Sequence, residues 1–95
     1  MNLSLDYDET YTRDPVFWDH FIKLARDSGH KVYCVTMRYG LPSAEALEVA
    51  ADLNGKVDAI FFTERKAKNN FMYEQGISIN VWIDDMPTFI LHDAR

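Results

Sequence analysis

The sequence has one cysteine, few basic residues and no long apolar run, and each shortage narrows the class of protein. Cys34 cannot form an intramolecular disulfide and is predicted to be a core residue, which favours a reducing compartment. Ten basic residues against fifteen acidic ones give a net charge of −5, which argues against a general grip on nucleic-acid backbone. With no secretion-signal pattern and no membrane-span pattern, we expect a cytoplasmic protein that does not enter membranes.

The length and composition indicate a single folded domain. The chain has 95 residues, of which 47% are hydrophobic and 26% charged, as in an ordinary globular protein. We therefore predict one domain over residues 1–95 and no disordered segment.

Short apolar runs alternate with helical patterns along the chain. Apolar runs over residues 3–5, 31–35, 57–62 and 79–83 predict strands buried on both faces. Helices are predicted from Pro15 to before Gly29, from Pro42-Ser43 to Asn54, and over 67–74. The C-terminal segment predicts a short helix from near Pro87, or else a fifth strand over 88–91. Alternation of this kind is typical of an α/β fold with a parallel sheet.

Apolar spacing also predicts which helix faces are buried. In the first helix, Phe17, Phe21, Leu24 and Ala25 fall on one apolar stripe, and in the second, Ala44, Leu47 and Ala51 do. We expect these stripes to face the sheet.

A polar residue suited to phosphate or metal chemistry follows each predicted strand. Since the carboxyl ends of parallel strands share one edge of a sheet, these side chains should converge. Carboxylates can hold a hard cation such as Mg²⁺, act as a nucleophile or donate a proton, and cations neutralise phosphate charge. The residues concerned are Asp6, Asp8, Thr36, Arg38, Lys66, Lys68, Asp84 and Asp85.

In this order, the motifs resemble those of the haloacid dehalogenase (HAD) superfamily of phosphotransferases. The matching segments are Leu3-Ser4-Leu5-Asp6-Tyr7-Asp8-Glu9-Thr10, then Val32-Tyr33-Cys34-Val35-Thr36, a helix-start lysine, and Val81-Trp82-Ile83-Asp84-Asp85. The resemblance spans nearly the whole chain. It implies a three-layer sandwich around a parallel sheet of about four strands in the order 4-1-2-3.

The resemblance also assigns roles to these residues. Asp6 would be the nucleophile that becomes aspartyl-phosphate, and Asp8 the general acid and then the base. The Asp6 carboxylate, the backbone carbonyl of Asp8, and Asp84 or Asp85 would bind Mg²⁺. Thr36 would hydrogen-bond a phosphoryl oxygen, and Lys68 or Lys66 would neutralise charge on the phosphate, with Lys68 preferred.

The family's usual cap domain has no room here, because Thr10 and the helix start at Pro15 are too close. An uncapped phosphatase of this kind would act on a large substrate, on a small molecule, or with a partner's surface as its lid. Thr36 followed two residues later by Arg38 also resembles the 3′-phosphatase domains of polynucleotide kinases. Arg38 would then hold a second phosphate of a nucleotide or nucleic-acid end, unless it is only a surface cation.

Other interpretations of the motifs remain open at this stage. The same residues could form a non-catalytic, regulatory phosphate-binding module, or a two-metal nuclease with clustered acids. A receiver domain is disfavoured, because its acid pair precedes its phosphorylated aspartate along the chain. Either a monomer or a homodimer is compatible with the two open edges of a small sheet.

Overall fold

The computed structural model describes residues 1–94 and contains a four-stranded parallel sheet. The strands are β1 (Asn2–Leu5), β2 (Lys31–Thr36), β3 (Ala59–Phe62) and β4 (Val81–Ile83). Their order across the sheet is β3-β2-β1-β4, with every neighbouring pair parallel. This confirms the predicted α/β class and strand order, and it places β1 and β2 at the centre.

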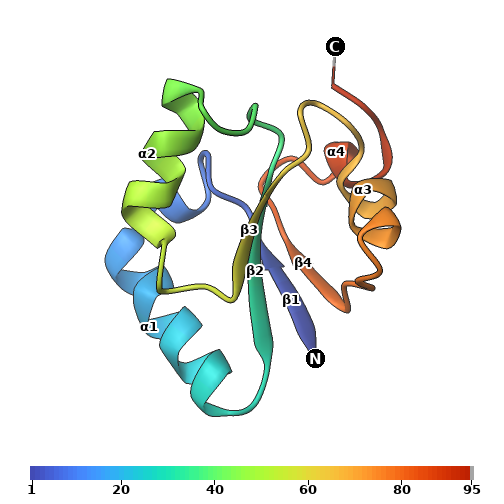
Figure 1. Cartoon of the computed structure of the whole chain (residues 1–95). Helices are drawn as coiled ribbons and strands as arrows, with labels where there is room; N and C mark the ends of the chain where they lie inside the picture. The colour runs from blue at the N-terminus through green and yellow to red at the C-terminus, as the bar shows by residue number, and fades with distance from the viewer. Residues whose placement is uncertain (95) are drawn as a thin grey trace.

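Helices cover both faces of this sheet, which gives three layers (Figure 1). Figure 1 shows α1 (Pro15–Asp27) and α2 (Ala44–Leu53) on one side, and α3 (Lys68–Glu74) and α4 (Thr88–Leu91) on the other. A short 3₁₀ turn, η1 (Tyr11–Arg13), joins β1 to α1. The alternative of a fifth strand over 88–91 is wrong, because this segment forms α4.

Side chains cap the starts of α1 and α2, at the residues where the sequence predicts these helices to begin. Asp14 accepts a hydrogen bond from the Phe17 N–H at the start of α1, and Ser43 accepts one from Ala46 at the start of α2. Helix α3 begins after Ala67, which has no side chain able to cap. Instead Asp93, far along the chain, accepts a hydrogen bond of 2.7 Å from the Ala67 N–H. The C-terminal segment therefore holds the start of α3.

The predicted buried faces of α1 and α2 are wrong in part. In α1, Ala25 is buried as predicted, together with Ile22, but Phe17 is 55% and Leu24 69% exposed. In α2, Leu47 is 57% exposed, whereas the buried residues are Ala46, Val49 and Leu53. Helix α2 carries two parallel apolar stripes. The stripe with the larger side chains, Ala46, Val49 and Leu53, packs against the sheet in place of the predicted one. This choice turns the other side of α2 outward.

The core lies between the sheet and the layer of α1 and α2. Leu5, Val32, Cys34, Val49 and Leu53 are fully buried there, and burial raises the pKa of the Cys34 thiol. This confirms the prediction that Cys34 is a core residue. Among residues 1–94, no helix is long and apolar enough to cross a membrane.

Candidate active site

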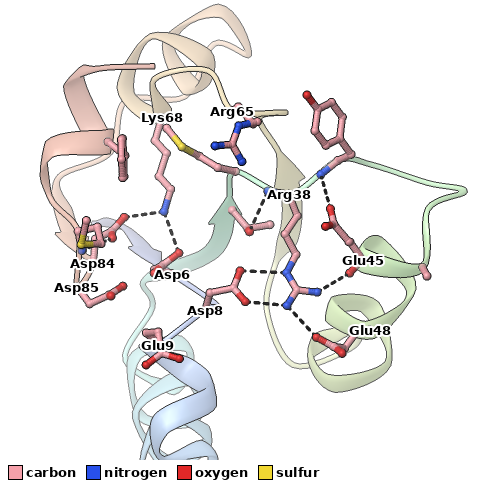
Figure 2. Close-up of a pocket in the computed structure, with 16 residues that line it drawn as sticks. Asp6, Asp8, Glu9, Arg38, Glu45, Glu48, Arg65, Lys68, Asp84 and Asp85 are labelled. Carbon is pink, nitrogen blue, oxygen red and sulfur yellow. Dashed lines mark hydrogen bonds and ion pairs between the residues drawn. The ribbon is translucent and has the colours of Figure 1, made fainter. Parts of the chain in front are cut away.

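A pocket of about 700 Å³ opens at the carboxyl ends of the strands. All the predicted site residues except Lys66 line it: Asp6, Asp8, Thr36, Arg38, Lys68, Asp84 and Asp85. They reach it from the ends of β1, β2 and β4 and from the first residue of α3 (Figure 2). The parallel sheet thus gathers residues that are up to 79 positions apart in the sequence.

The lysine at the start of α3 lies between two carboxylates. Lys68 Nζ is 2.9 Å from Oδ1 of Asp6 and 2.6 Å from Oδ2 of Asp84. The side chains of Lys68 and Asp84 are each only 4% exposed, so water screens these ion pairs little. Burial alone would lower the pKa of Lys68, but Asp6 and Asp84 outweigh it and hold that pKa above its ordinary value. Lys68 is therefore charged at neutral pH.

Burial has the opposite consequence for Asp6. It raises the pKa of this carboxyl to about 7, against the effect of Lys68, which favours the charged form. Asp84 and Asp85 raise the pKa further because they add negative charge and a hydrogen bond beside it. Without a further cation, Asp6 is thus partly protonated near neutral pH.

Three carboxylates form a group that can hold a metal ion. Asp6, Asp84 and Asp85 each offer an oxygen, and these oxygens lie within 4.8 Å of one another. The Thr10 hydroxyl lies 3.3 Å from Asp6 Oδ2 and 3.2 Å from Asp85 Oδ1, and it can donate its proton to either. The Met86 N–H fixes Asp84 by donating to its Oδ1. An all-oxygen set of this kind fits a hard divalent cation such as Mg²⁺.

The second aspartate of the first motif has a different partner. Asp8 accepts two hydrogen bonds from Arg38, of 3.0 Å from Nε and 2.7 Å from Nη2. Figure 2 shows Asp8 between Asp6 and Arg38, with its carboxylate directed at the Arg38 guanidinium. The Asp8 carboxylate is not part of the acidic trio of Asp6, Asp84 and Asp85 that could hold a metal ion.

Thr36 and the two candidate lysines occupy distinct environments. Thr36 is 1% exposed, lines the pocket, and accepts a hydrogen bond of 3.3 Å from the Arg38 N–H. Lys68 is buried in the pocket wall, whereas Lys66 is exposed and does not line the pocket. Lys66 sits in the loop before α3, where its backbone bonds to Thr63. The geometry therefore favours Lys68 over Lys66 as the site lysine.

Left-handed backbone conformations cluster around the pocket. Among residues 1–94, the non-glycine residues with positive φ are Glu9 (61°), Glu64 (55°) and Arg65 (69°). Glu9 and Arg65 line the pocket, and Glu64 directly precedes Arg65. Each such residue costs roughly 1–2 kcal/mol, and such strain is typical of functional sites.

The sequence did not reveal the roles of three residues in or beside the pocket. Thr10 lies in the first motif, but only the structure shows that its hydroxyl links Asp6 and Asp85. Glu45 and Glu48 escaped notice because they lie on α2, whose orientation depends on which of two apolar stripes is buried. Spacing of three residues put both glutamates on one side of α2, but the sequence did not show that this side faces the site.

The comparisons with known proteins identify no relative. No family model, curated protein or solved structure matches this chain. The functional argument therefore rests on the residues and their geometry.

Proposed function

We propose that this protein is a Mg²⁺-dependent phosphatase that acts on a phosphomonoester through an aspartyl-phosphate intermediate on Asp6. The observation that carries the proposal is Lys68, held between Asp6 and Asp84 at a strand-end pocket that also contains Asp85. We further propose that the chain is an uncapped member of the HAD superfamily, because the four motifs stand in that family's order.

The first half of the reaction forms a bond between an Asp6 carboxylate oxygen and phosphorus. As it forms, the bond from phosphorus to the alcohol oxygen breaks, and Asp8 donates its proton to that oxygen. Lys68 and the Thr36 hydroxyl lie at the pocket wall, where they can stabilise charge on the phosphoryl oxygens. A bound Mg²⁺ would neutralise charge on the phosphate and keep Asp6 ionised.

The second half releases phosphate. Asp8 takes a proton from water as the water oxygen attacks phosphorus, and the bond from phosphorus to Asp6 breaks. The products are inorganic phosphate and the regenerated carboxylate of Asp6. Asp8 thus returns to its protonated form for the next cycle.

The direct test is hydrolysis of p-nitrophenyl phosphate with and without Mg²⁺. We expect Mg²⁺-dependent turnover in the native protein and a loss of at least about 10³-fold in Asp6→Asn, which removes the nucleophile. Asp27→Asn is the matched control, because Asp27 is an exposed α1 residue paired with Lys23, outside the pocket. Full activity in Asp6→Asn would contradict the proposed nucleophile.

Three further measurements separate the alternatives. Beryllium fluoride should bind Asp6 as a phosphoryl mimic, with a ¹⁹F NMR signal that Asp6→Asn loses; a nuclease without a covalent aspartate would not give it. Phosphate binding without any turnover would instead indicate a non-catalytic module. Lys68→Ala should abolish turnover and Lys66→Ala should retain it, which tests the choice between the two lysines.

A further inference from the structure

The pocket carries a strong excess of acidic groups. Among the residues that the structure describes, seven carboxyl side chains line it but only three basic ones, Arg38, Arg65 and Lys68. The formal excess is four negative charges, which is most of the net charge of the chain. A divalent cation would offset two of them, and a phosphate dianion would restore them.

Lys68 and Arg38 are both paired with carboxylates. Lys68 lies between Asp6 and Asp84. Arg38 directs Nε and Nη2 at Asp8, and Nη1 donates to the backbone carbonyl of Glu45 at 3.0 Å.

The Arg38 guanidinium is also closed in on its remaining sides. Its Nη2 lies 2.8 Å from Glu48, and its face covers the Tyr7 ring at 4.9 Å. Only 19% of the Arg38 side chain is exposed. Arg38 could hold a second phosphate only if the pairs with Asp8 and Glu48 were broken, which disfavours the expectation from sequence that it grips one.

On the rest of the rim, the carboxylates of Glu9, Glu45 and Glu48 outnumber the one basic group that the structure describes there, Arg65. Helix α2 presents Glu45 and Glu48 one turn apart beside Arg38, and Glu9 lies below Asp8 (Figure 2). The side chains of Glu48 and Glu9 are 60% and 67% exposed, so salt should screen their effect on a substrate. A substrate that extends beyond its phosphate must pass these carboxylates.

We propose that the pocket selects phosphomonoesters whose alcohol part is neutral or cationic, an inference that rests on the proposed phosphatase function. The carboxylates of Glu45 and Glu48 reject esters that carry a second phosphate or a carboxylate. Nucleic-acid 3′ ends belong to the rejected class, because each adds phosphodiester charges beside the reacting group. Like charges brought together at a rim slow association of the more anionic ester and so create specificity against it.

Matched substrates test the selectivity. Glycerol 3-phosphate and 3-phosphoglycerate differ by one carboxylate, and thymidine 3′-monophosphate differs from its 5′-extended dinucleotide by one phosphodiester and the nucleoside that it carries. We expect kcat/KM to be roughly tenfold lower for the more anionic member of each pair at low salt. Phosphoethanolamine should be turned over at least as well as glycerol 3-phosphate.

Variants and salt locate the cause of the selectivity. The ratio within each pair should shrink toward one in Glu45→Gln/Glu48→Gln, and should also shrink in the native protein at 1 M salt. Glu74→Gln is the matched control, because Glu74 is an exposed acid of α3 outside the pocket. The salt series needs no variant, so it tests the inference even if the double variant does not fold.

The outcomes distinguish this inference from the proposed function. Absence of turnover on every substrate, p-nitrophenyl phosphate included, would overturn both. Turnover of p-nitrophenyl phosphate with equal kcat/KM within each pair, or with a preference for the more anionic member, would overturn the selectivity alone.

Discussion

At the scale of a single residue, the proposed role of Asp6 as a nucleophile conflicts with its burial. A nucleophile must be ionised, yet burial holds the pKa of Asp6 near 7 in the metal-free protein. Lys68 supplies part of the required positive charge, and a divalent cation would supply the rest. Under the proposed function, Asp6 would therefore need a cation to be fully ionised at neutral pH.

This conflict predicts how pH affects stability. The pKa of Asp6 is about 7 when folded and 3.8 ordinarily, so between these values the folded state binds the extra proton. The free energy of unfolding should therefore fall as pH rises from about 4 to 7. Asp6→Asn removes the buried charge and should raise that free energy by about 1–4 kcal/mol at pH 8 with EDTA.

Urea unfolding at pH 4 and pH 8 measures this difference. The advantage of Asp6→Asn over the native protein should be present at pH 8 and nearly gone at pH 4. Asp27→Asn, in an exposed ion pair, should show little change at either pH. A less stable Asp6→Asn at pH 8 would show that its ion pair with Lys68 outweighs burial.

Arg38 gives a second prediction at this scale. Because it holds Asp8 through two hydrogen bonds, we expect Arg38→Met to misplace the proton donor. An alkyl alcohol needs that proton to leave and nitrophenolate does not, so kcat/KM, which reports the first half of the reaction, should fall about 10–100-fold on an alkyl phosphate and much less on p-nitrophenyl phosphate.

The split between kcat and KM identifies the role of Arg38. Arg38→Lys keeps the charge but loses the paired geometry, and it should fall between the native protein and Arg38→Met. A rise in KM with unchanged kcat would instead identify Arg38 as a substrate ligand.

At the scale of elements, α3 depends on a residue from another part of the chain. Its first turn has no local cap, and Asp93 accepts the Ala67 N–H while the Ala94 N–H donates to the Arg65 carbonyl at 2.8 Å. Lys68 is the next residue after Ala67. The C-terminal segment thus fixes the position of the site lysine.

We therefore expect Asp93→Ala to lower the free energy of unfolding by about 1 kcal/mol and to reduce kcat. Asp93→Asn keeps an acceptor oxygen and should restore both. Urea unfolding and steady-state kinetics on the same preparations measure the two effects. Native kcat in Asp93→Ala would mean that Lys68 is held without this cap.

The elements also show which parts of the site were predictable. Each apolar run followed by Asp or Thr marks a strand end, and a parallel sheet places strand ends together, so Asp6, Thr36 and Asp84 were predictable as neighbours. The role of α2 was not, because two apolar stripes compete for burial. The Asp93 cap was not either, since no local pattern links residues 26 positions apart.

Strand lengths were overestimated for a related reason. Hydrophobicity predicted strands over 57–62 and 79–83, but the strands in the structure extend only over 59–62 and 81–83. Val57 is buried without being in a strand, and its N–H donates to the Leu53 carbonyl. Burial alone thus produces the apolar signal, whereas pairing needs a neighbouring strand.

At the scale of the whole molecule, the acidic surplus is concentrated in the pocket. Mg²⁺ should therefore bind the folded state and stabilise it by mass action. At ten times Kd the gain is about 1.4 kcal/mol, or roughly 6–11 °C in Tm for a domain of this size.

Thermal unfolding across a Mg²⁺ titration checks this expectation. Asp85→Asn removes one carboxylate of the acidic trio and should weaken the shift, whereas Asp27→Asn should keep it. A Tm that does not respond to Mg²⁺ in the native protein would contradict the metal site.

The strand order has a consequence for the time at which the site forms during synthesis. β1 pairs with both β2 and β4. During synthesis, Asp6 at the end of β1 leaves the ribosome long before Asp84 and Asp85, which follow β4. A nascent chain ending before β4 has Asp6 and Lys68 but lacks two of the three carboxylates for the cation. Under the proposed function, a chain that ends before residue 84 would therefore lack the cation site and with it the activity.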